Sequence, residues 1–226
     1  MVPLVRPLLP IAVFIALSGM AACSSNTSFD NPKPSSEKSG SATEVVTITP
    51  LDEAGEPRSD YAIVHEMRET ECRLASPSAV APDIVRCGTT ADSTDVCWVT
   101  PKRTTLFCGV SPWETTLREF YSAEPVQKAE PEDNPLPWAM ELADGQRCQR
   151  RIGGAWDALP FELIGAYYCI DSEYIIADGP DVKLFDKSTD LWSVQTVDVL
   201  KAVKEGDAYN LPARQSVTKV YFAGRS

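Results

Sequence analysis

The sequence predicts a mainly β protein, a disulfide-bonded antiparallel sandwich or barrel. Short segments rich in Val, Ile, Thr and aromatic residues are bounded by Pro, Gly, Asp and Ser, which is typical of strands between tight turns. The 18 prolines argue against long helices. When Cys23 is set aside, the other six of the 7 cysteines form an even set that suits three disulfides.

Strands are expected along the chain wherever such segments occur, and the segment 61–74 has an ambiguous pattern and is left unassigned. The expected strands cover residues 45–49, 95–100, 105–110, 138–143, 146–152, 192–199 and 217–223. The pair Asp144-Gly145 separates two of them, because Asp-Gly suits the positive φ angles of a type I′ turn. We therefore expect a β-hairpin over 138–152.

A second expected hairpin fixes one disulfide. If Thr100 pairs with Thr105, the same register places Cys97 opposite Cys108. Such a bridge stabilises the fold by roughly 3 kcal/mol through loop-closure entropy. By proximity along the chain we expect two further bridges, Cys72–Cys87 and Cys148–Cys169.

A proline-rich and acidic segment at 122–137 is a candidate boundary inside the domain 44–226. Four of the paired cysteines precede it and two follow, so each side can close its own bridges. Two small β lobes, 44–121 and 138–226, are compatible with this pattern. One domain with a long crossing loop is equally compatible.

The amino terminus has the three parts of an export signal: Arg6, an apolar run over 8–17 and small residues up to Ala22. A run of this length is too short to span a bilayer as a helix. The tetrapeptide Met20-Ala21-Ala22-Cys23 resembles the lipobox of bacterial lipoproteins, although that family usually has Leu where Met20 stands. The resemblance implies that residues 1–22 are removed and that Cys23 carries the lipid, a palmitate-type acyl anchor. Ordinary secretion with cleavage after Ser24 is the alternative.

Residues 23–43 combine the anchor cysteine with a Ser-rich stretch that holds one aromatic residue, Phe29. Such a stretch buries too little apolar surface to fold by itself. We expect a flexible tether that spans about 25 Å. It would hold the following domain at the extracytoplasmic face of the cell membrane.

Charge and composition exclude several classes of function. The net charge of −11 becomes −12 when the signal with Arg6 is lost, so nucleic acid is not an expected partner. The one basic concentration is Arg147, Arg150 and Arg151, where Arg147 and Arg151 share a strand face and Arg150 points the other way. An anion site there is less expected than a solvated strand.

Catalytic patterns are mostly missing. His65 is the only histidine and is interpreted as structural or exposed, and no Gly-x-Ser-x-Gly or Cys-x-x-Cys motif occurs. We therefore expect no enzyme, no metal and no cofactor. A wall-polymer hydrolase that uses two carboxylates is kept as the alternative, because sequence spacing need not reveal such a pair. The densest acidic groups are Asp52, Glu53 and Glu56, and Glu130, Glu132 and Asp133, all in expected loops.

The 5 tryptophans carry the remaining hint. The usual role of such rings is to fill a β core, but exposed aromatic rings can also stack on sugars or acyl chains. Trp113 and Trp156 lie furthest from the strand patterns, so they are the candidate ligand-binding residues. The spacing of Cys97-Trp98, Ser111-Pro112-Trp113, Pro137-Trp138, Cys148, Trp156 and Leu191-Trp192 is similar to that of uncharacterised actinobacterial envelope lipoproteins.

The expected function is thus a non-catalytic binding or interaction module of the cell envelope, anchored to the membrane through Cys23. Its expected partners are a glycan, a glycolipid or another protein. A purely structural spacer is the least favoured reading.

Overall fold

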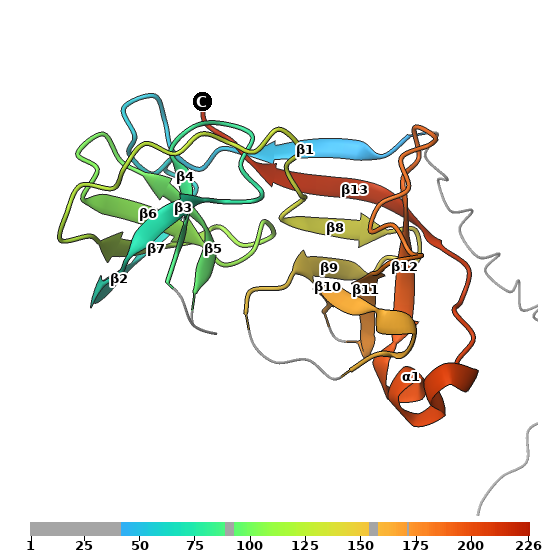
Figure 1. Ribbon diagram of the computed structural model, residues 1–226. Helices are drawn as coiled ribbons and strands as arrows, with labels where there is room; N and C mark the ends of the chain where they lie inside the picture. The colour runs from blue at the N-terminus through green and yellow to red at the C-terminus, as the bar shows by residue number, and fades with distance from the viewer. Residues whose placement is uncertain (1–41, 89–92, 154–157, 171) are drawn as a thin grey trace, which may run out of the picture. The chain divides into compact units, whose positions relative to one another are not determined.

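Two β-sheets make up most of the part of the chain that the computed structural model describes, which is residues 42–88, 93–153, 158–170 and 172–226 (Figure 1). These residues form thirteen strands, one α-helix and two short 3-10 helices. The mainly β class and the three disulfides confirm the sequence prediction. All described residues belong to a single compact unit.

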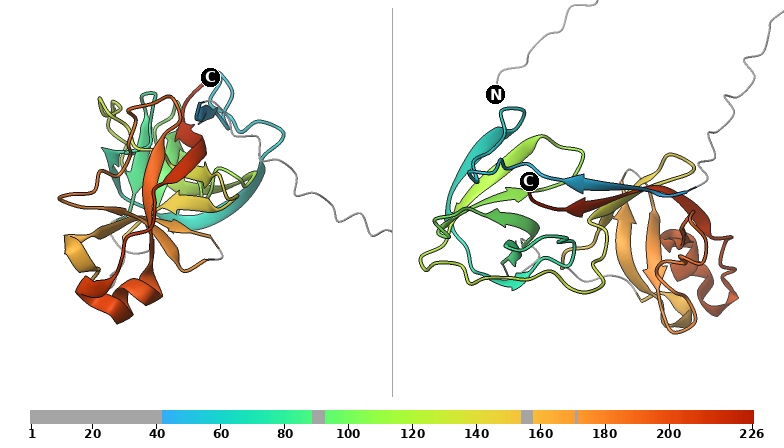
Figure 2. Two further views of the ribbon diagram at one scale, coloured as in Figure 1. Left: turned by 90° about the vertical axis from the view of Figure 1, so that its right-hand side faces the viewer. Right: turned by 90° about the horizontal axis from the view of Figure 1, so that it is seen from above.

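The larger sheet closes into a six-stranded antiparallel barrel. Its strands are β8 (Ala139–Leu142), β9 (Arg147–Arg150), β10 (Ile164–Cys169), β11 (Tyr174–Asp178), β12 (Ser193–Asp198) and β13 (Gln215–Ala223). Neighbours in the chain pair with each other, and β13 closes the barrel by pairing with both β12 and β8. Strand β1 (Glu44–Ile48) runs parallel to β13 and pairs with it, as Figure 2 also shows.

The other sheet has six strands in the order β2-β7-β6-β5-β4-β3. Their bounds are β2 (Ala62–Glu69), β3 (Cys72–Ala75), β4 (Ile84–Cys87), β5 (Thr94–Val99), β6 (Thr105–Gly109) and β7 (Thr116–Tyr121). The segment 61–74, which the sequence left unassigned, contains β2 and β3. Strand β2 pairs with β7 in parallel, whereas the other pairs of this sheet are antiparallel.

The strands thus divide between the two sheets on either side of 122–137, with β1 as the exception because it pairs with the barrel. Val126 within that segment is buried and its N–H donates to the carbonyl of Arg103. The backbone N–H of Leu136 donates to the carbonyl of Pro77. The segment therefore runs along the first sheet before it reaches β8.

Two tryptophans fill the core where residues of both sheets meet. Trp98 of β5 and Trp138, just before β8, are each 1% exposed, and their ring centroids lie 6.0 Å apart in an edge-on arrangement. Leu117 and Ala223 belong to the same cluster. The barrel has its own apolar interior, which includes the Cys148–Cys169 bridge. Core packing thus accounts for these two tryptophans, and Trp192 packs, partly buried, against the barrel interior.

All three expected disulfides are confirmed. Cys72–Cys87 joins β3 to β4, Cys97–Cys108 joins β5 to β6, and Cys148–Cys169 joins β9 to β10. The predicted register of the β5–β6 hairpin is also confirmed, since Cys97 faces Cys108 and the N–H of Thr100 donates to the carbonyl of Thr105. Each bridge ties two adjacent strands.

The expected hairpin over 138–152 is present, but its predicted type I′ turn is wrong. Of the two turn residues, only Gly145 has a positive φ, at 87°. The N–H of Gly145 donates to the carbonyl of Leu142, and the N–H of Leu142 donates to the carbonyl of Gln146. This is the pattern of a three-residue loop in which the glycine takes the left-handed position.

The expected strand 192–199 is β12, which ends at Asp198 instead of residue 199. The carboxylate of Asp198 accepts a hydrogen bond from the N–H of Lys201 at 3.0 Å and caps helix α1 (Val199–Glu205). The 3-10 helices are η1 (Pro160–Glu162) and η2 (Gly206–Ala208). None of the described helices has the length and the apolar character that a membrane crossing requires.

Candidate functional site

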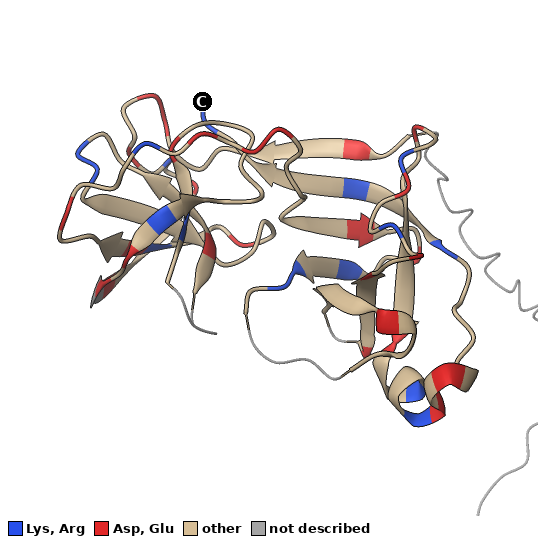
Figure 3. Ribbon diagram, viewed as in Figure 1, with Lys and Arg blue, Asp and Glu red and all other residues tan. Residues whose placement is uncertain are grey.

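A row of alternating charges crosses the outer face of four neighbouring strands, β1, β13, β8 and β9 (Figure 3). The register places Glu44 beside Lys219, Lys219 beside Glu141, and Glu141 beside Arg147. Lys219 Nζ lies 3.1 Å from Glu44 Oε2, and Arg147 Nε lies 3.7 Å from Glu141 Oε1. Cross-strand pairs of opposite charge stabilise this face modestly.

Trp113 lies against this row. Its indole Nε1–H donates to Glu141 Oε1 at 2.9 Å, and the hydroxyl of Tyr221 donates to the same oxygen at 2.8 Å. The rings of Trp113 and Tyr221 meet edge to face with centroids 5.6 Å apart. The guanidinium carbon of Arg147 lies 5.3 Å from the Trp113 ring centroid, close enough for a cation–π contact. Trp113, expected to be exposed, is half-buried and held in one orientation.

The loop that carries Trp113 joins β6 to β7 in the first sheet, yet it lies on the barrel. Ser111 Oγ accepts a hydrogen bond from the N–H of Trp113 at 3.3 Å, a local turn that follows from a serine before Pro112. The side-chain amide of Gln149, on β9, donates to the carbonyl of Val110. The barrel strands thus fix the position of this loop.

The phenol of Tyr221 is shifted by its surroundings. Burial raises the pKa of Tyr221, and its hydrogen bond to the negative carboxylate of Glu141 raises it further, to about 12. Both causes stabilise the protonated phenol. Tyr221 therefore remains a hydrogen-bond donor to Glu141 at neutral pH.

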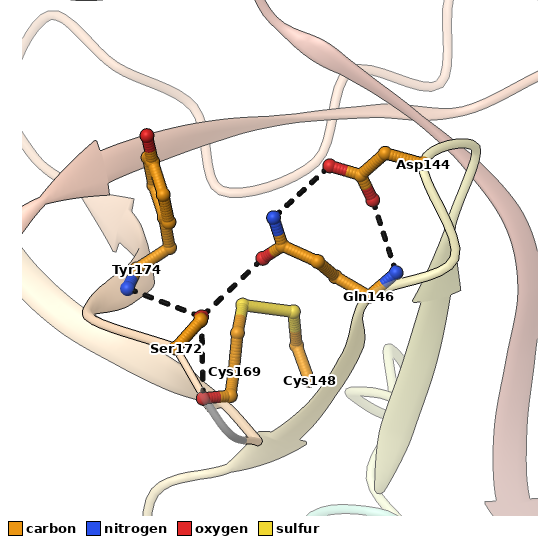
Figure 4. The surroundings of a disulfide bond; sticks show 6 residues. All are labelled: Asp144, Gln146, Cys148, Cys169, Ser172 and Tyr174. Atoms are coloured by element: carbon orange, nitrogen blue, oxygen red, sulfur yellow. Dashed lines mark hydrogen bonds between the residues drawn. A yellow bond between two sulfur atoms is a disulfide. The ribbon is translucent and has the colours of Figure 1, made fainter. Parts of the chain in front are cut away.

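A hollow of about 420 Å³ opens beside this cluster, between the β8–β9 turn and the β10–β11 turn (Figure 4). Its lining combines polar and apolar surface in about equal parts. The described lining residues are Asp144, Gly145, Gln146, Arg147, Ile170, Ser172 and Tyr174. The Cys148–Cys169 bridge lies directly behind it and holds the two strands that carry the turns.

The side chains in this hollow are ordered by hydrogen bonds between its two turns. Gln146 Nε2 donates to Asp144 Oδ2 at 3.0 Å, and the Asp144 carboxylate also accepts from the backbone N–H of Gln146. Ser172 Oγ lies 3.5 Å from Gln146 Oε1 and accepts from the N–H of Tyr174 at 3.2 Å. Figure 4 shows the carboxamide of Gln146 between Asp144 and Ser172.

Arg147 belongs to both features, because it lines the hollow and also contacts Trp113 and Glu141. We call the combined area the Trp113 surface. It consists of Trp113, Glu141, Asp144, Gln146, Arg147, Ser172, Tyr174 and Tyr221. It offers aromatic rings and hydrogen-bonding groups of both kinds, donors and acceptors, on the barrel and on the β6–β7 loop that packs against it.

A larger open cleft, of about 650 Å³, lies on the first sheet between residues 69–73 and 122–127. It carries three exposed glutamates, Glu69, Glu71 and Glu124. Arg73 forms an ion pair with Glu71.

The other predicted residues fall in several places. Cys23 and Trp156 lie outside the described residues. His65, with its side chain 69% exposed, contacts Glu119 through Nδ1, and the hydroxyl of Tyr121 donates to the other carboxylate oxygen of Glu119 at 2.9 Å. The two acidic groups of the sequence lie in loops and are exposed, namely Asp52, Glu53, Glu56, Glu130, Glu132 and Asp133.

The basic cluster is divided between two faces, as expected. Arg147 points to the outer face, whereas Arg150 donates to the buried Asp95 at 2.7 Å. Arg151 Nε donates to the carbonyl of Gly153 at 3.2 Å. Because Arg147 and Arg150 both have carboxylate partners, the cluster does not present three converging cations to an anion.

Sequence reasoning selected Trp113 but not the groups around it. Glu141, Gln146 and Ser172 are ordinary polar residues in the sequence. Pairing of β9 with β10 brings the two turns together, and packing of the β6–β7 loop on the barrel places Trp113 beside them. The chain matches no known family model, and comparison with curated proteins and with solved structures also gave no match.

Proposed function

We propose that this protein is a lipid-anchored, extracytoplasmic binding module that holds a glycan of the cell envelope on the Trp113 surface. The observation that carries the proposal is the double role of Arg147, which contacts the Trp113 ring and lines the polar hollow. A sugar ring presents an apolar face and a rim of hydroxyls. A ring platform beside a polar hollow matches both parts.

The polar groups of the surface suit hydroxyl ligands. Asp144 supplies acceptors, Arg147 supplies donors, and Gln146 and Ser172 supply both. Their hydrogen bonds to one another hold them in place before a ligand arrives, which reduces the entropy lost on binding. This pre-organisation of the polar side chains favours specific recognition over non-specific binding.

The charge of the surface favours a neutral glycan over an anionic one. Glu141 and Asp144 provide two carboxylates against the single guanidinium of Arg147. An added uronate or phosphate would meet net negative charge. A neutral oligosaccharide is therefore the ligand class we favour, and glycolipids enter as carriers of the same sugar.

The location is part of the proposal. The signal at 1–22, Cys23 and the Ser-rich stretch up to residue 43 support export and acylation. An acyl chain alone gives weak membrane binding, so binding to an envelope glycan would add a second attachment. Membrane fractionation of the full chain against a Cys23→Ser form tests this part, because loss of the thiol should release the protein.

The ligand proposal is tested on the exported domain with an array of neutral gluco-, galacto- and manno-oligosaccharides and their uronic-acid analogues. We expect binding to neutral sugars, and a loss of about tenfold or more in affinity for Trp113→Ala and Arg147→Met. Trp192→Ala is the matched control, since Trp192 is also half-buried but contacts Lys187 and Phe185 instead. Unchanged affinity in folded Trp113→Ala, or preference for the uronates, would contradict the proposal.

The second candidate is a wall-polymer hydrolase, which the three glutamates of the open cleft favour. Release of reducing ends from purified wall polymer measures it directly. Glu69→Gln, Glu71→Gln and Glu124→Gln should each leave the signal at background if the protein only binds. Turnover that one of these changes abolishes would support the hydrolase instead.

A further inference from the structure

Two disulfides of the first sheet lie so close together that their sulfur atoms form one cluster. The Sγ atoms of Cys87, Cys97 and Cys108 are all within 4.8 Å of one another. Cys87 belongs to the bridge with Cys72, and Cys97 and Cys108 form the neighbouring bridge. Strands β4 and β5 are hydrogen-bonded neighbours, which explains how the two bridges meet.

Most of this cluster is shielded from solvent. Cys97 and Cys108 are 0% exposed and Cys87 is 2% exposed, within a core that also contains Val126. Cys72 is the most accessible of the four at 6%, and it lines the open cleft of about 650 Å³. A reagent in the cleft would therefore reach the first bridge from the Cys72 side, whereas the second bridge has no such approach among the described residues.

We propose that these four cysteines form a disulfide relay that accepts electrons from a thiol bound in the cleft. In the first step, the thiolate attacks Cys72 Sγ and forms a mixed disulfide, and the Cys72–Cys87 bond breaks. The electron pair of that bond leaves with Cys87, now a thiolate. This step uses the side of the bridge that faces the cleft.

In the second step, the Cys87 thiolate attacks a sulfur of its neighbour. A bond from Cys87 to Cys97 forms, the Cys97–Cys108 bond breaks, and Cys108 leaves as a thiolate that takes a proton. Attack on Cys108 is the mirror alternative, with Cys97 as the leaving thiolate. A second thiol then attacks the mixed disulfide and releases an external disulfide and the Cys72 thiol. Two thiols are thus oxidised to one disulfide, and of the two bridges in the first sheet one is reduced by two electrons.

The cleft also selects the charge of the thiol. Glu69, Glu71 and Glu124 provide three carboxylates against the guanidinium of Arg73. A thiol that carries a positive charge near its sulfur should therefore react faster than one that carries a negative charge. The relay does not depend on the glycan proposal, because the cleft and the Trp113 surface share no residue.

The relay is tested by partial reduction of the folded protein with cysteamine, a cationic monothiol. Free thiols are trapped at acid pH, and the bridges are mapped by peptide mass spectrometry. We expect a cysteamine adduct on Cys72 and a non-native bridge from Cys87 to Cys97 or Cys108. The Cys148–Cys169 bridge of the barrel serves as the internal reference and should remain intact at this stage.

Two results would overturn the relay. One is reduction of Cys148–Cys169 as fast as Cys72–Cys87, and the other is a partly reduced population that contains native bridges only. The wild-type protein alone decides both, so the test does not depend on the folding of a variant.

A variant and a charge comparison sharpen the result. The variant Cys97→Ala/Cys108→Ala lacks the second bridge, so its Cys72 adduct should persist and no new bridge should form. The control variant Cys148→Ala/Cys169→Ala should still form the new bridge from Cys87. We compare cysteamine with 3-mercaptopropionate at low ionic strength, each rate being divided by the rate of the same thiolate with a neutral small disulfide. This normalised rate should be about fivefold higher for cysteamine, and salt should reduce the ratio. Equal normalised rates at low salt would contradict entry through the acidic cleft.

Discussion

Arg150 of β9 donates from Nη1 to Asp95 Oδ2 of β5 at 2.7 Å, and this ion pair joins the barrel to the first sheet. The Asp95 side chain is 1% exposed and that of Arg150 is 19% exposed. A carboxylate buried this deeply needs the guanidinium to compensate its charge, because water cannot reach it to solvate the charge instead. The pair therefore couples the two sheets.

Loss of either partner of this pair should be costly. Asp95→Asn and Arg150→Met should each lower the free energy of unfolding by about 3 kcal/mol, since the remaining group stays buried without its counter-charge. The double variant Asp95→Leu/Arg150→Met should lose much less free energy of unfolding than the two single variants lose together. Urea denaturation of all three forms measures this coupling, and simple additivity would show that the pair contributes nothing specific.

Gly109 should not tolerate a side chain. A Cβ at this position would lie 2.6 Å from the Trp138 ring and 3.3 Å from the Trp98 ring. We expect Gly109→Ala to cost about 1 to 3 kcal/mol through overpacking, measured by thermal unfolding and tryptophan fluorescence. Gly145→Asn is the control, because nothing lies near a Cβ there and Asn tolerates a positive φ. A small effect at Gly109 would mean that the two rings can move apart.

Asp83 should stabilise the fold above mildly acid pH. Both of its carboxylate oxygens accept from Arg103 at 2.9 Å, and these hydrogen bonds lower the pKa of Asp83. Asp83→Asn should cost about 1 to 2 kcal/mol at pH 7, a value reduced because both side chains are partly exposed. Asn also tolerates the φ of 59° that Asp83 adopts.

The pH dependence of the Asp83 effect has a defined sign. A lowered folded pKa gives stability that is present above the unfolded pKa of about 4 and is lost as the pH falls through the folded value. The difference between wild type and Asp83→Asn should shrink over that acid range. Asp60→Asn, which removes an exposed pair with Arg58, should have little effect at any pH, and an equal effect would refute the special role of Asp83.

Tyr221 should titrate about two pH units later than an ordinary tyrosine. A spectrophotometric titration should contain a phenol with a pKa of about 12 that is lost in Tyr221→Phe. The pKa of Tyr221 is higher in the folded protein than in the unfolded chain, so the protonated phenol contributes to the free energy of unfolding. This contribution is complete below the unfolded pKa of about 10 and is lost as the pH rises through about 12. Glu141→Gln should lower this pKa without restoring the ordinary value, since burial is the larger cause. An unchanged titration in Tyr221→Phe would refute the assignment.

The local parts of the fold were predictable from the sequence. The β5–β6 hairpin is short, so the positions of Cys97 and Cys108 alone define its register, and all three bridges join neighbouring strands. The error at Asp144-Gly145 concerns one residue of loop length, which the dipeptide does not determine. Helix α1 was missed because Val199, Leu200 and Val203 also suit a strand.

The parts that depend on distant segments were not predictable. The parallel pairs β1–β13 and β2–β7 join strands that are far apart in the chain, and nothing in either sequence indicates its pairing partner. The same limit applies to the candidate site. Trp113 stands out as a tryptophan after Ser-Pro, but Glu141 becomes its hydrogen-bond partner only through the packing of a loop of one sheet on the other.

Strand β13 has a consequence for the order in which the protein folds. It contacts β1, β8 and β12, so the barrel cannot close before the last strand of the chain is available. The first sheet has no such delay, because β2 to β7 are complete at residue 121. A chain that emerges from its amino terminus therefore keeps the barrel open until its end has emerged. Such late closure with long-range pairing is intrinsically slow.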